Sequence, residues 1–442
     1  MNKINNYITK LKKDKFWNNL FKNSFWAFIG DASSSVIGLL VTIFLIRIIG
    51  SDFYGILVLA QSYMQILDVI INVQSWKSVI QYGQKAIVNK NKELLHSYVK
   101  LGTILDVTTA IICCIISILI ASFVGRIFGW SKELVICAQI FSITIVSHFS
   151  GTPTAILRLL NKFNLVALQK FISAFLKIVT LFVIYKIYGN LSLINSVIIY
   201  MITDFIGNIL LVIFAFVEYN KKYGVNGIIK AKLPNDFKQF ITFTLWGTLS
   251  EIVDIPVNYI DVFIISLLGN KMVSVFKVFK QVVSILQKVT SPIQQSILPQ
   301  FSELSARNEK KRGYEVVTKI QKVSFKIGIV FSILIGLSSP LWLKFIYGEL
   351  YASYWYVLLL YLVIQTYALS YTTIHPFYLS LDKARNSTLY ILIANIVYLI
   401  VAYLLVLKLG IIGMVIAFGV QVILAINLKR LDILHSLKKG EI

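Results

Sequence analysis

The chain has 442 residues, of which 57% are hydrophobic, and a mean hydropathy of +0.76, a composition that excludes an ordinary soluble globular protein. Its formal charge of +23 would be typical of a nucleic-acid-binding protein if the positive residues formed one patch. The three cysteines, Cys113, Cys114 and Cys137, lie within apolar runs, and their spacing indicates neither a disulfide framework nor a metal site.

Apolar runs long enough to cross about 30 Å of hydrocarbon recur along the whole sequence. Backbone polar groups in lipid must be hydrogen-bonded within each segment, so the runs are predicted to be helices. The predicted fold is therefore all-α, a polytopic membrane protein with twelve transmembrane helices. The expected spans are 24–46, 53–81, 101–124, 133–157, 164–186, 191–217, 240–267, 272–300, 318–343, 354–380, 386–407 and 411–431.

The positive charges lie where the orientation of a membrane protein would place them. With an even number of spans and a cytoplasmic N-terminus, most of the 43 Lys and Arg residues fall in cytoplasmic segments, in accord with the positive-inside rule. Orientation and contact with membrane lipids therefore explain the charge, and nucleic acid is not an expected partner. Both termini are expected to be cytoplasmic.

A polar break near the middle divides six spans from six. The expected domains are an N-terminal six-helix bundle at 1–217, a cytoplasmic linker at 218–239 and a C-terminal six-helix bundle with a basic tail at 240–442. An internal repeat at an offset of 219 supports this division, because Ile49-Gly50-Ser51-Asp52 aligns with Leu268-Gly269-Asn270-Lys271. Two bundles of like orientation predict a substrate path between them near the midplane.

The span at 272–300 carries a polar stripe that includes three lysines. Lys277, Lys280, Ser284 and Lys288 lie within a sector of roughly 80° on one helix face. Each charge at membrane depth costs about 2.5–3.5 kcal/mol on insertion scales. The stripe therefore favours contact with an anionic substrate in a cavity. The alternative is polar contact between buried helices, for which hydroxyls and amides would suffice.

The span at 53–81 carries a matching stripe of Gln61, Gln65, Asp68 and Asn72. At the same offset, Gln61 aligns with Lys280, Gln65 with Ser284 and Asp68 with Gln287. A pseudo-twofold arrangement would place the two stripes on opposite sides of one central cavity. We expect both stripes to face a polar substrate in that cavity.

The span at 240–267 carries three carboxylates and a proline. Glu251, Asp254 and Asp261 lie on one face, and they could simply neutralise the lysines of the next span. Alternatively, one or two of them bind Na⁺ or H⁺ and couple ion entry to substrate movement. Pro256 removes a backbone donor and is expected to bend the helix, which would free a carbonyl near Asp254.

Other charges at depth have simpler interpretations. Lys177 could reach Asp204 on the next helix, whereas Arg47, Lys77 and Arg158 are expected to extend toward the membrane interface. The histidines at 96, 148 and 435 suggest no function, and His375-Pro376 indicates a kink. No catalytic motif, metal-binding spacing or nucleotide-binding loop is present, so an enzyme is not expected. No cofactor is expected beyond a coupling ion.

Two motifs resemble those of a known family. Arg47-Ile48-Ile49-Gly50-Ser51-Asp52-Phe53-Tyr54-Gly55 is similar to the R-x-L-G-x-x-x-(F/Y)-G signature of bacterial polysaccharide flippases. Ile297-Leu298-Pro299-Gln300-Phe301-Ser302-Glu303-Leu304 is similar to their P-x-(L/F)-S-x-L ending of helix 8. The chain thus resembles Wzx-type O-antigen flippases of the multidrug/oligosaccharidyl-lipid/polysaccharide (MOP) exporter superfamily.

This resemblance implies a fold, a substrate and a location. The fold would be two pseudo-symmetric six-helix bundles in a V that alternates between inward-open and outward-open states. The substrate would be an undecaprenyl-pyrophosphate-linked oligosaccharide, moved across a bacterial inner membrane for lipopolysaccharide or related polysaccharide biosynthesis, and polysaccharide polymerase machinery would be a partner. Asp261 matches the helix-7 aspartate of sodium sites in relatives. The alternatives are a multidrug antiporter of the same superfamily and a membrane glycan polymerase or ligase.

Overall fold

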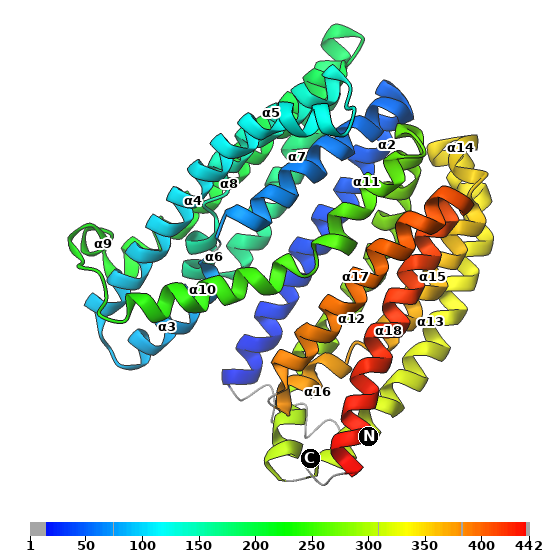
Figure 1. Cartoon of the computed structure of the whole chain (residues 1–442). Helices are drawn as coiled ribbons and strands as arrows, with labels where there is room; N and C mark the ends of the chain where they lie inside the picture. The colour runs from blue at the N-terminus through cyan, green and yellow to red at the C-terminus, as the bar shows by residue number, and fades with distance from the viewer. Residues whose placement is uncertain (1–14, 74, 308, 382, 439–442) are drawn as a thin grey trace. The chain divides into compact units, whose positions relative to one another are not determined.

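The computed structural model describes residues 15–73, 75–307, 309–381 and 383–438, and every regular element in these ranges is helical (Figure 1). The predicted all-α fold is thus confirmed. The ends of the chain, including the start of the N-terminal segment and the end of the basic tail, lie outside the described residues. The N-terminal elements are α2 (Lys15–Ile71), α3 (Trp76–Val88), α4 (Lys92–Ile127), α5 (Lys132–Thr144), η1 (Ile145–Ser147), α6 (Gly151–Leu159), α7 (Phe163–Tyr188), α8 (Leu193–Tyr223) and α9 (Asn226–Lys230).

The second half begins with three short or broken elements, α10 (Phe237–Ile252), the π-helix η2 (Pro256–Ile260) and α11 (Asp261–Ser266). Long helices follow. They are α12 (Asn270–Ala306), α13 (Lys310–Tyr347), α15 (Trp355–Ser370), α17 (Ala384–Leu409) and α18 (Ile411–Lys438), with the short α14 (Glu349–Ala352) and α16 (Ile374–Ser380) between them.

Among the described residues, nine helical segments are long and apolar enough to cross a membrane. The expected number was twelve, and the difference has identifiable causes. One of the nine is the 50-residue segment Lys22–Ile71, which holds two crossings because its backbone leaves helical geometry at Gly50. The segment from α10 to α11 is broken, and α12 is made more polar by its lysines. With these three additions the count agrees with twelve spans in a multi-pass membrane protein.

The aligned glycines of the internal repeat adopt related backbone conformations. Gly50 has a φ of 83° and Gly269 a φ of 95°, a region that favours glycine over residues with a side chain. Each glycine separates two successive helices, within α2 in one case and between α11 and α12 in the other. The sequence repeat therefore corresponds to a repeated helix junction.

The chain divides into two compact units, and both are discontinuous in sequence. Unit 1 takes the described residues up to Val41 and Leu67–Leu249, whereas unit 2 takes Thr42–Ile66 and the described part of Ser250–Ile442. In unit 2, a Cβ atom placed on Gly55 would lie 2.0 Å from the carbonyl oxygen of Asn270. The absence of a side chain at Gly55 thus allows this part of α2 to pack directly on the start of α12.

In each unit, a lysine that precedes one long helix forms an ion pair with a carboxylate near the end of the next long helix. In unit 1, Lys162 precedes α7 and forms a 2.8 Å ion pair with Glu218 near the end of α8. In unit 2, Lys383 precedes α17 and forms a 3.2 Å ion pair with Asp432 near the end of α18. The two lysines end similar short sequences, Leu160-Asn161-Lys162 and Leu381-Asp382-Lys383, of which Asp382 lies outside the described residues.

Several of the expected spans are broken where a regular helix would be the default. The interruptions follow α2, lie between α5 and α6, lie between α10 and α11, and separate α15 from α16. Non-helical backbone at membrane depth is tolerated only where it is buried in protein or lines a polar cavity. The breaks therefore mark the places where a functional site is expected.

Candidate functional site

The break between α10 and α11 is built around Pro256. Helix α10 ends at Ile252, and the π-helix begins at the proline, as expected from its missing N–H. In the π register the amide of Asp261 bonds to the carbonyl of Pro256, five residues back. The predicted bend is confirmed, and it leaves the carbonyl of Val257 for another donor.

That donor is Lys280 of α12. Its ammonium lies 2.9 Å from the carbonyl oxygen of Val257, 3.0 Å from that of Asn258 and 2.7 Å from Oδ2 of Asp261. The sequence predicts that Pro256 frees a backbone carbonyl near Asp254. In this structure the cation on those carbonyls is the lysine side chain itself.

Asp261 is fully engaged in the same contact. Its side chain is 2% exposed, its Oδ2 accepts from Lys280, and its Oδ1 accepts from the amide of Val262 at 2.8 Å. Lys280 and Asp261 thus form a buried neutral pair that joins α12 to α11. In this structure, Lys280 and Asp261 therefore neutralise each other.

Lys277 lies one turn before Lys280 on the same helix and is half-buried. None of the described residues forms a hydrogen bond or an ion pair with its ammonium, although Lys280 and Asp261 both act on it electrostatically. Because the neighbouring pair is neutral, Lys277 leaves this site with one uncompensated positive charge.

The rest of the predicted stripe has mixed surroundings. Ser284 donates to the carbonyl of Gln281 at 2.7 Å, Gln287 is exposed, and Lys288 has interactions of its own. Gln61 and Gln65 lie in the portion of α2 that belongs to unit 2, together with α12, and are half-buried.

Asp254 and Glu251 lie just before the π-helix. Asp254 is exposed, and no described residue donates a hydrogen bond to its carboxylate, although Glu251 and the buried Lys429 of α18 act on it electrostatically. The backbone beside it is held by Asn395, whose amide donates to the carbonyl of Val253 at 2.6 Å. Sequence analysis did not identify Asn395, because a single amide in an apolar span carries no spacing signal.

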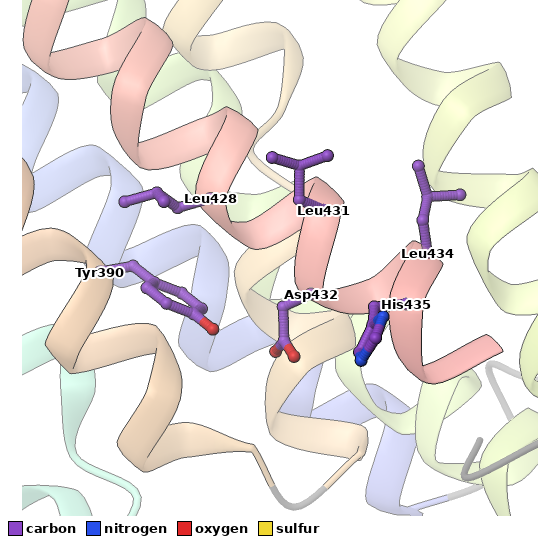
Figure 2. A pocket seen from close by; sticks show the side chains of 6 residues that line it. All are labelled: Tyr390, Leu428, Leu431, Asp432, Leu434 and His435. Carbon is purple, nitrogen blue, oxygen red and sulfur yellow. The ribbon is translucent and has the colours of Figure 1, made fainter. Parts of the chain in front are cut away.

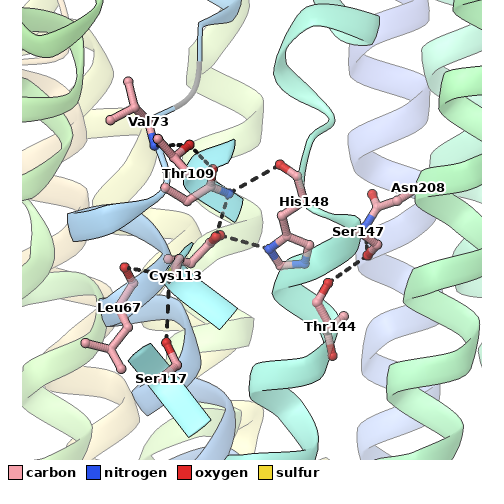
Figure 3. Close-up of polar contacts among 11 residues, drawn as sticks. Leu67, Val73, Thr109, Cys113, Ser117, Thr144, Ser147, His148 and Asn208 are labelled. Atoms are coloured by element: carbon pink, nitrogen blue, oxygen red, sulfur yellow. Dashed lines mark hydrogen bonds and ion pairs between the residues drawn. The ribbon is translucent and has the colours of Figure 1, made fainter. Parts of the chain in front are cut away.

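Asp68 and Asn72 belong to unit 1 rather than to the unit that holds the lysines. The carboxylate of Asp68 accepts from Asn72 at 2.8 Å and lies 2.9 Å from Nδ1 of His148, in the network drawn in Figure 3. His148 could not be selected from sequence alone, because it precedes α6 by three residues and lies 80 positions from Asp68.

The other intramembrane charges have defined partners. Lys177 and Asp204 form the predicted pair at 2.7 Å. Arg47 donates to the carbonyls of Phe345 and Ile346 at the end of α13. The guanidinium of Arg158 lies 4.7 Å from the centre of the ring of Trp76, the first residue of α3.

A pocket of about 550 Å³ lies between α17 and α18, with Tyr390 and His435 among its lining residues (Figure 2). It contains none of the residues predicted to bind substrate or ion. Its acidic member, Asp432, is already bonded to Tyr378 at 2.7 Å and paired with Lys383. The pocket is therefore not the candidate site.

The family of the chain is decided by its sequence. The family model described as "Polysaccharide biosynthesis protein" matches residues 20–305. The chain belongs to this family. It is 26% identical to the "Putative O-antigen transporter" of Shigella flexneri over 421 residues, covering 92% of this chain and 95% of that protein. It is 28% identical over 164 residues to "Inner membrane protein YghQ" of Escherichia coli (strain K12), covering 37% of this chain and only 46% of YghQ.

Solved structures establish the fold of this polysaccharide biosynthesis protein. An inward-facing multidrug resistance MATE family transporter of the MOP superfamily matches with a TM-score of 0.70 at 15% identity, covering 95% of each chain. The lipid II flippase MurJ in an inward closed conformation matches with a TM-score of 0.67 at 18% identity, covering 93% of this chain and 87% of MurJ. The polysaccharide biosynthesis family member thus has the fold of MOP superfamily transporters.

Proposed function

We propose that the chain is a flippase that moves an undecaprenyl-pyrophosphate-linked oligosaccharide from the cytoplasmic to the outer face of a bacterial inner membrane. The observation that carries the proposal is the uncompensated ammonium of Lys277, in a polysaccharide biosynthesis protein with a transporter fold. A pyrophosphate cannot cross hydrocarbon without compensation of its charge. Lys277 offers that charge without first breaking an ion pair with a described residue.

The remaining polar side chains have proposed roles around this lysine. Lys288 adds positive charge further along α12, and the amides of Gln61, Gln65 and Gln287 replace water at sugar hydroxyls. The Lys280–Asp261 pair supports the site by holding α12 against the π-helix, and Lys280 contacts the pyrophosphate only in conformations that open this pair. The prenyl chain stays in the lipid, and both termini face the cytoplasm.

Ion coupling, if the transporter uses a gradient, is assigned to Asp254 with Glu251. The carboxylate of Asp254 is exposed and lies beside a helix break, so it can accept H⁺ or Na⁺. Asp261 is a poorer fit for a metal ion in this conformation, because the amide of Val262 and the ammonium of Lys280 already occupy its oxygens. Replacing Asp254 with Asn should abolish the response of transport to the coupling gradient.

The test is a strain that lacks the gene for this chain. The proposal predicts loss of surface polysaccharide with build-up of lipid-linked repeat units on the cytoplasmic face. Complementation with Lys277→Ala should restore less polysaccharide than complementation with the matched surface variant Lys271→Ala, which removes an exposed lysine from the same helix.

Other outcomes would overturn the proposal. Normal polysaccharide together with increased sensitivity to cationic drugs would favour a multidrug antiporter, which shares the fold. Repeat units trapped on the outer face would favour a polymerase or ligase.

A further inference from the structure

Two helix breaks in unit 1 are joined by a histidine–carboxylate pair. Asn72 directly follows the end of α2, and His148 directly follows η1, so both residues stand at interruptions of predicted spans. Nδ1 of His148 lies 2.9 Å from Oδ2 of Asp68. The two elements come from distant parts of the chain, and this contact connects the end of α2 to the end of η1.

A second residue reinforces the connection. The amide of Asn72 donates to Oδ1 of Asp68 at 2.8 Å and to the backbone carbonyl of His148 at 3.3 Å. Its own oxygen accepts from the hydroxyl of Thr109 on α4 at 3.1 Å, and the same hydroxyl accepts from the amide of Val73 at 3.2 Å (Figure 3). Both oxygens of Asp68 are therefore directed at groups that belong to the two breaks.

The neighbouring carboxylate in unit 1 serves as a contrast. Asp106 of α4 accepts from the amide of Ser75 at 2.8 Å, and from the amide and hydroxyl of Thr152 at 2.6 Å and 2.7 Å. These donors stand at the starts of α3 and α6, where backbone N–H groups lack intrahelical partners. Asp106 is 1% exposed, and its donors are backbone amides and a hydroxyl, which do not titrate. Asp106 therefore links the helices through donors that do not change with pH.

The Asp68–His148 link has a different chemistry because it includes an imidazole. A carboxylate accepts hydrogen bonds, so Nδ1 of His148 carries a hydrogen and Nε2 is the nitrogen that can gain or lose a proton. No described residue forms a hydrogen bond with Nε2. The side chains are 20% exposed for His148 and 12% for Asp68, so the described residues do not enclose the pair completely.

The charges that face this pair do not neutralise it. Asp204 of α8 acts electrostatically on His148, but Asp204 is paired with Lys177 of α7 at 2.7 Å. On α4, the thiol of Cys113 donates to the carbonyl of Leu67, and Asp106 is satisfied as described. With neutral His148 the pair therefore carries one negative charge at membrane depth, and uptake of one proton on Nε2 makes it neutral.

We propose that Asp68 and His148 form a proton-binding site, separate from the carboxylates of unit 2, and that its occupancy sets how firmly the two helix breaks are held together. With the proton bound, the imidazolium of His148 donates a strong charge-assisted hydrogen bond that joins the breaks. Without it, the neutral imidazole donates a weaker hydrogen bond to the carboxylate. Proton binding at this site does not require substrate. Its use in transport, where proton release would loosen the breaks, rests on the proposed function.

The test is ¹⁵N NMR of the histidine rings in the full chain, purified and reconstituted in lipid vesicles without substrate. The sequence has only four histidines, so a variant with His96, His375 and His435 all replaced by Gln isolates the signals of His148. We expect Nε2 to change protonation reversibly between about pH 5 and about pH 8 while Nδ1 keeps its hydrogen. Asp68→Asn should move this transition to lower pH by about one unit or more.

A ring that stays in one protonation state across this range would overturn the proposal, as would a transition that Asp68→Asn leaves in place. A histidine of the same unit supplies the control. His96 is bonded through Nδ1 to the hydroxyl of Tyr219 at 2.8 Å, and in a second variant that keeps His96 alongside His148 its titration should not respond to Asp68→Asn. Because no substrate is present, failure of this experiment is independent of failure of the flippase assay.

Discussion

Replacing Lys280 with Met tests whether the Lys280–Asp261 pair holds unit 2 together. The change removes an ammonium that contacts one carboxylate and two backbone carbonyls, and it leaves Asp261 with the amide of Val262 alone. Removing one partner of a buried ion pair costs about 3–5 kcal/mol. Because Lys280 is 19% exposed and Asp261 only 2%, water screens one end of the pair. We therefore expect a loss of about 3 kcal/mol, the lower end of this range.

A second substitution should reverse most of this loss. Adding Asp261→Asn to Lys280→Met removes the buried negative charge, so the double variant should be more stable than Lys280→Met by about 2 kcal/mol. The unfolding free energy is measured for the full chain in mixed micelles by titration with a denaturing detergent and circular dichroism. Lys277→Met is the matched control, since it removes a lysine without a described ion pair and should cost less than about 1 kcal/mol.

Two results would show that the Lys280–Asp261 pair does not stabilise unit 2. Lys280→Met could leave stability unchanged, which would mean that the pair contributes nothing to the folded state. Alternatively, Lys280→Met and the double variant could be equally unstable, which would mean that the lost interactions are those with the carbonyls of Val257 and Asn258 rather than with Asp261.

Three further predictions concern other parts of the fold. Gly50→Ala should cost about 1–3 kcal/mol because Gly50 has a φ of 83°, whereas Gly38→Ala, at a helical position with open space around it, should not destabilise the chain; thermal unfolding compares the two. Lys177→Met should cost about 1–2 kcal/mol by leaving Asp204 unpaired, and adding Asp204→Asn should restore stability in the same assay. Asp106→Ala should raise hydrogen exchange at the starts of α3 and α6, and unchanged exchange would show that the amides have other partners.

The helical architecture could be predicted from the sequence because a bilayer imposes a strong and simple constraint. Apolar length and hydrogen-bond satisfaction within each span led to twelve helices, and the repeated glycines at 50 and 269 correctly marked equivalent junctions. The bend at Pro256 was predictable for a similar reason, since a missing N–H acts locally. These features depend on neighbouring residues in the chain.

The partners of the polar side chains were less predictable because they depend on distant segments. Helical periodicity placed Asp68 on one stripe with Gln61 and Gln65, yet the structure assigns Asp68 to unit 1 and the glutamines to unit 2. The contact between Asp68 and His148 spans 80 positions, and nothing near His148 in the sequence signals it. By contrast, Lys177 and Asp204 lie on consecutive helices, and their pairing was predicted correctly.

Movement of a lipid-linked oligosaccharide across a membrane can be measured with the purified protein alone. Lipid-linked oligosaccharide extracted from a strain without the gene is incorporated into vesicles with or without the chain, and its accessibility to a membrane-impermeant oxidant is followed over time. We expect oligosaccharide in the inner leaflet to become accessible in vesicles that contain the chain, and to do so more slowly with Lys277→Ala. Equal accessibility with and without the chain, under every ion gradient applied, would show that the chain is not a flippase for this lipid-linked oligosaccharide.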